Sequence, residues 1–159
     1  MSLMTILEMQ MSYRKEEDPF DLTLEKWIRI RQFVGIASTL SYFQELLQAA
    51  NIAVPFCFEY QGKGCFGCPL ENVCGPGKGA RLLKVMKLIH THYLAILAGN
   101  MLPKEPLISE IDGWLRELEM VKAKPEYLNP KSETNLHAPF GAPRRMKINS
   151  IFGSNSNTK

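Results

Sequence analysis

Four cysteines lie within eighteen consecutive residues of this chain, and they restrict its fold more than any other feature. Cys57, Cys65, Cys68 and Cys74 follow the pattern C-x7-C-x2-C-x5-C, and the 159 residues contain no other cysteine. Four thiolates this close in sequence can surround one metal centre without ligands from elsewhere in the chain. The pattern therefore predicts an irregular metal-binding loop over residues 55–77, with these four cysteines as the metal ligands.

The spacing of the cysteines bears on the kind of metal. Zinc ribbons usually contain two C-x2-C pairs, whereas this chain has one such pair with unequal gaps on either side. Unequal and mostly longer gaps suit the four separate irons of a cubane cluster, so a [4Fe–4S] cluster is the predicted cofactor. One Zn²⁺ is the alternative cofactor, and two disulfides are a third possibility in an oxidising compartment.

The expected cellular compartment favours a metal site over disulfides at the four cysteines. Residues 1–10 contain no basic leader, and Glu8 interrupts their apolar stretch, so a secretory signal is not expected. No apolar run approaches the roughly 20 residues that span a bilayer. We therefore expect a cytoplasmic protein with no membrane partner, in a reducing environment where clustered cysteines favour metal.

Apolar residues recur at steps of three and four over most of the chain, and no segment alternates with period two. The sequence predicts a mostly α fold, a small domain of three to four helices with extended termini. Gly35 and Ser38 can divide or bend a first helical region that starts near Leu22 and stops at Pro55. Further helices are expected over about 78–99 and from Pro106 to just before residue 125.

Composition divides the chain into three parts. Residues 1–21 carry five acids and two bases, and we expect them to be a flexible acidic leader. Residues 22–125 form the predicted helical metal-binding domain. Residues 126–159 carry five bases and two acids, contain prolines at positions 130, 139 and 143, and end in a polar run. This composition predicts an extended basic tail.

The end of the cysteine segment resembles loops of known iron–sulfur proteins. Residues 65–74, CFGCPLENVC, resemble the [4Fe–4S] loop of endonuclease III-type and adenine-specific DNA glycosylases, whose pattern is C-x6-C-x2-C-x5-C. The C-x2-C-x5-C triplet is also similar to that of WhiB-like transcription regulators and CRISPR-associated RecB-type nucleases. The resemblance implies a [4Fe–4S] cofactor and an association with DNA or transcription, and it covers eighteen residues.

The rest of the chain lacks the catalytic features of those families. The first cysteine gap is seven residues rather than six, and we find no helix-hairpin-helix, no Gly-Val-Trp-Gly-Gly turn and no nuclease sheet. The loop GPGKGAR at 75–81 does not fit the phosphate-binding Walker pattern. The sequence also shows no arrangement of residues typical of a hydrolase active site, such as a Ser–His–Asp triad. The sequence does not decide whether the protein is an enzyme, although it favours a non-catalytic role.

Two groups of basic residues are candidate nucleic-acid contacts. Lys78, Arg81, Lys84 and Lys87 recur every three residues near the start of the second predicted helix, and Arg144, Arg145 and Lys147 lie in the tail. Such residues either contact phosphates or form a solvated surface.

The histidines of the second predicted helix and the aromatic residues around the cysteines each allow two interpretations. His90 and His92 are two positions apart on a helix, cannot chelate one ion together, and are expected to be spectators. The aromatic residues around the cysteines could stack on bases, although shielding a cluster from water is the favoured role: Phe56, Phe58, Tyr60 and Phe66.

These observations lead to three hypotheses of function. The first is a non-catalytic iron–sulfur protein that acts as a nucleic-acid-associated or regulatory subunit of a larger complex, with nucleic acid or a protein assembly as its partner. The second is a zinc-stabilised adaptor or structural subunit that binds other proteins. The third is an electron-transfer protein that uses the same cluster.

Overall fold

The computed structural model describes residues 2–74 and 77–124, and this part of the chain is helical. It contains seven α-helices and one short 3-10 helix and no strand, which confirms the predicted mostly α fold. The elements are α1 (Ile6–Arg14), α2 (Pro19–Ile36), α3 (Leu40–Asn51), α4 (Pro55–Tyr60), η1 (Gln61–Lys63), α5 (Glu71–Cys74), α6 (Ala80–Leu97) and α7 (Glu105–Lys122). The predicted number of three to four helices is too low, because the N-terminal region and the cysteine segment also form helices.

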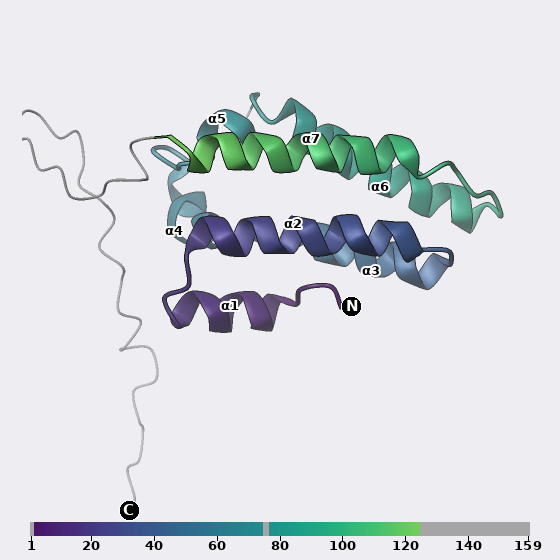
Figure 1. The fold of residues 1–159 in the computed structure, drawn as a ribbon, viewed down its shortest axis with the longest axis horizontal. Helices are drawn as coiled ribbons and strands as arrows, with labels where there is room; N and C mark the ends of the chain where they lie inside the picture. Colours follow the sequence, from purple (N-terminus) through teal and green to yellow (C-terminus); the bar gives the residue numbers. More distant parts are fainter. Residues whose placement is uncertain (1, 75–76, 125–159) are drawn as a thin grey trace, which may run out of the picture.

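The four long helices form a bundle in which each packs against two others. Helix α2 contacts α3 and α7, and α6 contacts α3 and α7. Consecutive helices run in opposite directions, and α4 and α5 lie together at one end of the bundle (Figure 1). The cysteine segment connects the α2–α3 pair to the α6–α7 pair at this end.

Large apolar side chains fill the space between the four helices. Trp27 of α2 and Trp114 of α7 meet edge to face, with ring centroids 6.1 Å apart. Ile30, Leu46 and Leu118 are completely buried. The apolar spacing that predicted the helices therefore identifies the faces that build the core.

Local signals set the ends of these helices. The Asp18 carboxylate accepts hydrogen bonds from the backbone N–H groups of Phe20 and Asp21, and Pro19 occupies the first turn of α2, as expected at a helix start. At the C-terminal end of α6, Gly99 has φ of +81° just beyond the last helical residue, which confirms the predicted end of this helix.

The prediction of a flexible leader over residues 1–21 is wrong for the part that the structure describes. Met9 of α1 is completely buried and packs with Met4 and Leu22 in a small cluster separate from the main core. Glu8 of α1 forms an ion pair with Arg29 of α2. The acidic composition suggested a solvated segment, but Glu8 and Asp21 form ion pairs with α2 and α7, and Asp18 caps α2.

The predicted extended tail, 126–159, lies outside the described residues, together with Arg144, Arg145 and Lys147. Within the described part of the chain, no helix is both long enough and apolar enough to cross a membrane.

Candidate metal centre

The four cysteines lie on short helices and tight turns at one end of the bundle. Cys57 is in α4, Cys65 and Cys68 are in the turns between η1 and α5, and Cys74 is the last residue of α5. The predicted loop over 55–77 is therefore more regular than expected. Pro55, predicted to end a helix, is the first residue of α4, where its missing N–H is not needed.

The turn that holds Cys65 has an uncommon backbone conformation. Gly64 and Cys65 both have positive φ, +64° and +65°, which is the left-handed region that glycine adopts readily and cysteine rarely. The N–H of Cys65 donates to the carbonyl oxygen of Tyr60, and the N–H of Cys68 donates to that of Cys65. A strained cysteine held by backbone hydrogen bonds is typical of a residue whose side chain has a specific task.

The chain also approaches Cys74 very closely. A Cβ atom at position 79 would lie 3.1 Å from the Cα atom of Cys74 and 3.2 Å from its carbonyl oxygen, so Gly79 leaves room for the end of α5. At position 62, in contrast, an added Cβ atom would meet nothing within 4 Å. A side chain at position 79 would therefore have to displace Cys74 slightly, whereas one at position 62 would not.

The thiols lie between the core and the surface. Cys68 is 9% exposed and belongs to the main core, and the other three are half-buried and pack against it. All four are free cysteines rather than disulfides. A centre in this position would be attached to the bundle on one side and near solvent on the other.

The pKa values of two of the four thiols are raised. Burial, followed by negative charge on Cys68, Cys57 and Cys65, raises the pKa of Cys74 to about 12. The pKa of Cys68 is also raised, first by burial and then by Cys65 and Cys57 among other groups. Without metal, these two thiols therefore keep their protons at neutral pH.

The side-chain positions are not those of ligands closed around an ion. Among residues 2–74 and 77–124, no three histidine, cysteine or acidic side chains form a group that could hold a metal ion. The donor set nevertheless suits a metal, because four thiols in one neighbourhood are the ligands that structural zinc and [4Fe–4S] clusters use.

A buried lysine near Cys57 was not predicted from the sequence. Lys26 of α2 is 3% exposed, and burial lowers its pKa to about 8, while the negative charge of Cys57 acts in the opposite direction. Its position could have been noticed, because Lys26 stands four residues from both Leu22 and Ile30 on the apolar face of α2.

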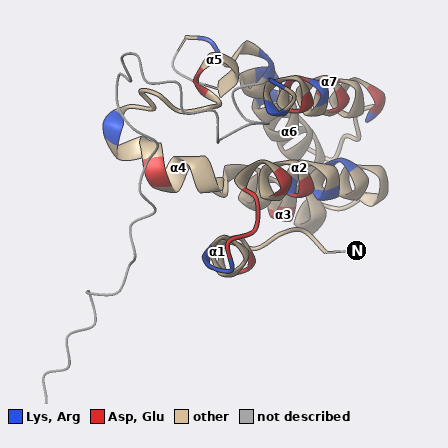
Figure 2. Ribbon diagram, turned by 60° about the vertical axis from the view of Figure 1, so that its left-hand side comes forward, with Lys and Arg blue, Asp and Glu red and all other residues tan. Residues whose placement is uncertain are grey.

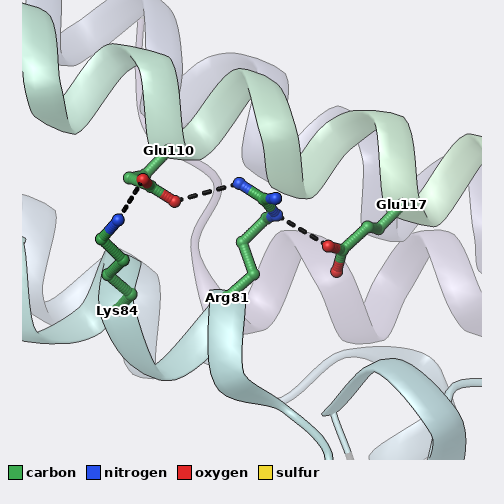
Figure 3. A network of polar contacts seen from close by, with 4 residues as sticks. All are labelled: Arg81, Lys84, Glu110 and Glu117. Atoms are coloured by element: carbon green, nitrogen blue, oxygen red, sulfur yellow. Dashed lines mark hydrogen bonds and ion pairs between the residues drawn. The ribbon is translucent and has the colours of Figure 1, made fainter.

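The basic residues predicted near the start of α6 differ in how strongly their charges are paired. Arg81 reaches Glu110 and Glu117 of α7, and Lys84 also contacts Glu110 (Figure 3). Gly113 of α7 makes room for this network, because a Cβ atom there would overlap the guanidinium of Arg81. The Arg81 and Lys84 charges are therefore already offset by α7.

The other two basic residues are more available. Lys78 is exposed and lies 3.4 Å from Glu71, with a hydrogen bond to Asn72. Lys87 is exposed and forms no ion pair with any other described residue. Figure 2 shows acidic and basic residues together on α2 and α7, whereas α6 contains basic residues and no acidic one.

The histidines do not join the cysteines. His92 is buried, stacks on Phe43 of α3, and has its ring nitrogens 2.8 and 3.0 Å from the carbonyl oxygens of Leu88 and Pro103. His90 is exposed and lies near Tyr93. His92 is therefore held by the core and by backbone carbonyl groups, and His90 lies on the surface of α6.

The aromatic residues around the cysteines have different surroundings. Phe56 is buried against Phe20 of α2, and Phe58 is partly exposed beside Tyr13 of α1. Tyr60 is half-buried, whereas Phe66, between Cys65 and Cys68, is 76% exposed. Phe56 and Tyr60 therefore belong to the main core or pack against it, whereas Phe58 and Phe66 are exposed.

Comparison with protein-family models, with curated proteins and with solved structures finds no match to this chain. The likeness of residues 65–74 to iron–sulfur loops therefore stays a prediction about the cofactor.

Proposed function

We propose that this protein is a non-catalytic [4Fe–4S] protein in which Cys57, Cys65, Cys68 and Cys74 hold the cluster. The observation that carries the proposal is the placement of all four cysteines in the short segment from α4 to α5, where Cys68 belongs to the main core and the other three pack against it. The strained turn at Cys65 and the close approach at Gly79 support the same role, since both fix the backbone that presents a cysteine.

The cluster would serve the fold. Cysteines from α4, from the turn and from α5 would be joined by the metal, which would connect the α2–α3 pair to the α6–α7 pair. Because all four cysteines are ligands in this proposal, none remains as a nucleophile, and we propose a binding role in the cytoplasm rather than catalysis.

The proposed partner is nucleic acid or a larger nucleoprotein assembly. Lys78 and Lys87 are the candidate phosphate contacts on the described surface, together with Arg144, Arg145 and Lys147 of the tail. Arg81 and Lys84 are weaker candidates than the sequence suggested, because their ion pairs to α7 would have to be exchanged for phosphate contacts.

A second candidate function is a zinc-stabilised adaptor that binds another protein. The observation that favours it is Phe66, a large apolar side chain that is 76% exposed within the cysteine segment. Exposed aromatic residues are common in protein interfaces.

Metal analysis of anaerobically purified full-length protein tests the cofactor. We expect a brown protein that absorbs near 400 nm and contains about four irons per chain. A colourless protein with one zinc per chain would instead support the adaptor. Because metal must displace protons from Cys68 and Cys74, affinity should rise with pH over the neutral range in either case.

Nucleic-acid binding is tested with charge-reversal variants of the metal-loaded protein. Lys78→Glu combined with Lys87→Glu should weaken binding to DNA or RNA and reduce its dependence on salt. Lys15→Glu, on the exposed end of α1, makes the same kind of change elsewhere and should have little effect. Equal binding by all three proteins would rule out the α6 surface as a contact.

A further inference from the structure

A buried amine in α2 has no carboxylate partner within the described part of the chain. Lys26 is 3% exposed, and its Nζ atom lies 5.1 Å from the centroid of the Trp27 ring. None of the ion pairs found in residues 2–74 and 77–124 includes Lys26. Burying an ammonium group is costly unless it is paired, so the surroundings of Lys26 need an explanation.

The hydrogen bonds of Lys26 lead toward the cysteines. Its Nζ donates to the carbonyl oxygens of Ala50, at 2.9 Å, and Ile52, at 2.5 Å. These carbonyl groups are at the end of α3, and Ile52 lies three residues before Pro55, where α4 begins. Lys26 therefore fixes the link between α3 and α4, and α4 carries Cys57.

Charge gives a second connection between Lys26 and the cysteines. Helix α2, which carries Lys26, contacts α4, which carries Cys57, and negative charge on Cys57 favours the protonated amine. Four thiolates around a centre of charge +2 leave a net charge of about −2 on the site. Such a site would supply the anion that the buried amine lacks.

We propose that Lys26 is the positioning residue and the counter-cation of the metal centre. It holds the α3–α4 link that places Cys57, and its positive charge offsets the negative charge of the ligated thiolates. This inference rests on the proposed function, because only a bound metal gives the four thiols a lasting negative charge.

A simpler role would be to cap the end of α3, where the carbonyl groups carry partial negative charge. A cap alone would affect folding but would have no specific effect on the electronic properties of a cluster. The reduction potential separates the two roles, because a nearby positive charge favours the addition of an electron.

The experiment compares full-length wild-type protein with Lys26→Met and Lys26→Gln after anaerobic reconstitution with ferrous iron and sulfide. Met removes the charge and the donor, whereas Gln removes the charge and keeps an amide donor for the two carbonyl groups. Both variants should make reduction about tenfold less favourable, which lowers a one-electron potential by about 59 mV. Should Lys26→Met not fold, Lys26→Gln provides the same comparison.

Lys104→Met is the matched control. Lys104 also donates to a backbone carbonyl, that of Gly35 at 3.1 Å, but it joins the other ends of α2 and α7. Its loss should leave the potential unchanged. A folded, cluster-loaded Lys26 variant with the wild-type potential would overturn the inference and leave the proposed function standing.

Cobalt provides the corresponding measurement for a single-metal site. If the wild type takes up no cluster but binds Co²⁺, both Lys26 variants should bind Co²⁺ about tenfold more weakly in competition with a chelator. Wild-type affinity in both would overturn the inference. A wild-type protein that binds neither iron–sulfur nor Co²⁺ would overturn the proposed function itself, and the role of Lys26 with it.

Discussion

The helical bundle and the cysteine segment are stabilised in different ways. In the bundle, long helices bury whole apolar faces, and residues such as Ile30 and Leu118 have no exposed surface. In the segment from α4 to α5 the helices are short, three of the four cysteines are half-buried, and Phe66 is 76% exposed. Apolar burial alone gives the segment much less stabilisation than it gives the bundle.

This difference indicates where a metal would matter. The bundle has a core that accounts for its helices, so it should keep its secondary structure when the cysteines are changed. The segment has backbone strain at Cys65, which fits a specific task for that side chain, whereas the raised pKa values of Cys68 and Cys74 follow first from burial.

Replacing a ligand should produce the largest difference between the two regions. In Cys74→Ala, metal binding should be lost because one of four ligands is missing, while the helical circular dichroism of the bundle should remain. Phe66→Ala, a change of an exposed residue in the same segment, should keep the metal. Full metal binding by Cys74→Ala would remove Cys74 from the ligand set.

A core substitution should have the next largest effect, and it should act on both regions. Trp114→Ala removes a buried ring packed on Trp27, which should lower the free energy of unfolding by about 3–5 kcal/mol. Trp114→Phe should cost less, because it keeps an aromatic ring and removes an indole N–H that has no acceptor among the described residues. Denaturant unfolding measures both, and equal losses would contradict this packing argument.

A smaller effect is expected at the close approach between α5 and α6. Gly79→Ala should displace Cys74 by a few tenths of an ångström and weaken metal binding, with little change in the unfolding of the metal-free bundle. Gly62→Ala is the control, since its added methyl group meets open space. Chelator competition compares the two variants, and identical affinities would show that the contact at Gly79 does not position the ligand.

The smallest effect concerns the ion pairs between α6 and α7. Hydrogen bonds and charge from Lys84 and Arg81 lower the pKa of Glu110. Its contribution to stability is therefore present above the unfolded-state pKa and is lost as the pH falls through the lowered value. Glu110→Gln should reduce the thermal midpoint slightly at pH 7, and the difference from the wild type should shrink below about pH 4.

Glu119→Gln is the control for this prediction, because Glu119 is exposed on the same helix and no ion pair to it is found in the described part of the chain. A difference between Glu110→Gln and the wild type that did not change with pH would contradict the assignment.

Sequence reasoning identified the long helices because their apolar periodicity is strong. The break at 37–39 between α2 and α3, the start of α7 near Pro106 and the end of α6 at Gly99 all follow from local residue chemistry. Helix α1 was missed because its buried surface depends on Met4 and Met9 packing against Leu22, a contact that appears only after folding.

The candidate site was predicted in part. The positions of the cysteines could be read directly, but the pairing of Arg81 with Glu110 and Glu117 could not, because it joins residues about thirty positions apart. The burial of Lys26 could have been predicted from its place on the apolar face of α2, but its hydrogen-bond partners could not. Its carbonyl partners at Ala50 and Ile52 come from another helix, so no local pattern announces them.

Hydrogen exchange with and without metal tests the central claim most directly. The backbone N–H groups of Cys65, Cys68 and Cys74 each donate to a carbonyl group within the segment, and their exchange reports its local opening. Reconstitution of the full-length protein with iron and sulfide should slow exchange strongly over residues 55–74 and leave the middle of α2 and α7 nearly unchanged. Equal exchange in the segment with and without iron and sulfide would contradict the claim that a metal centre completes this end of the bundle.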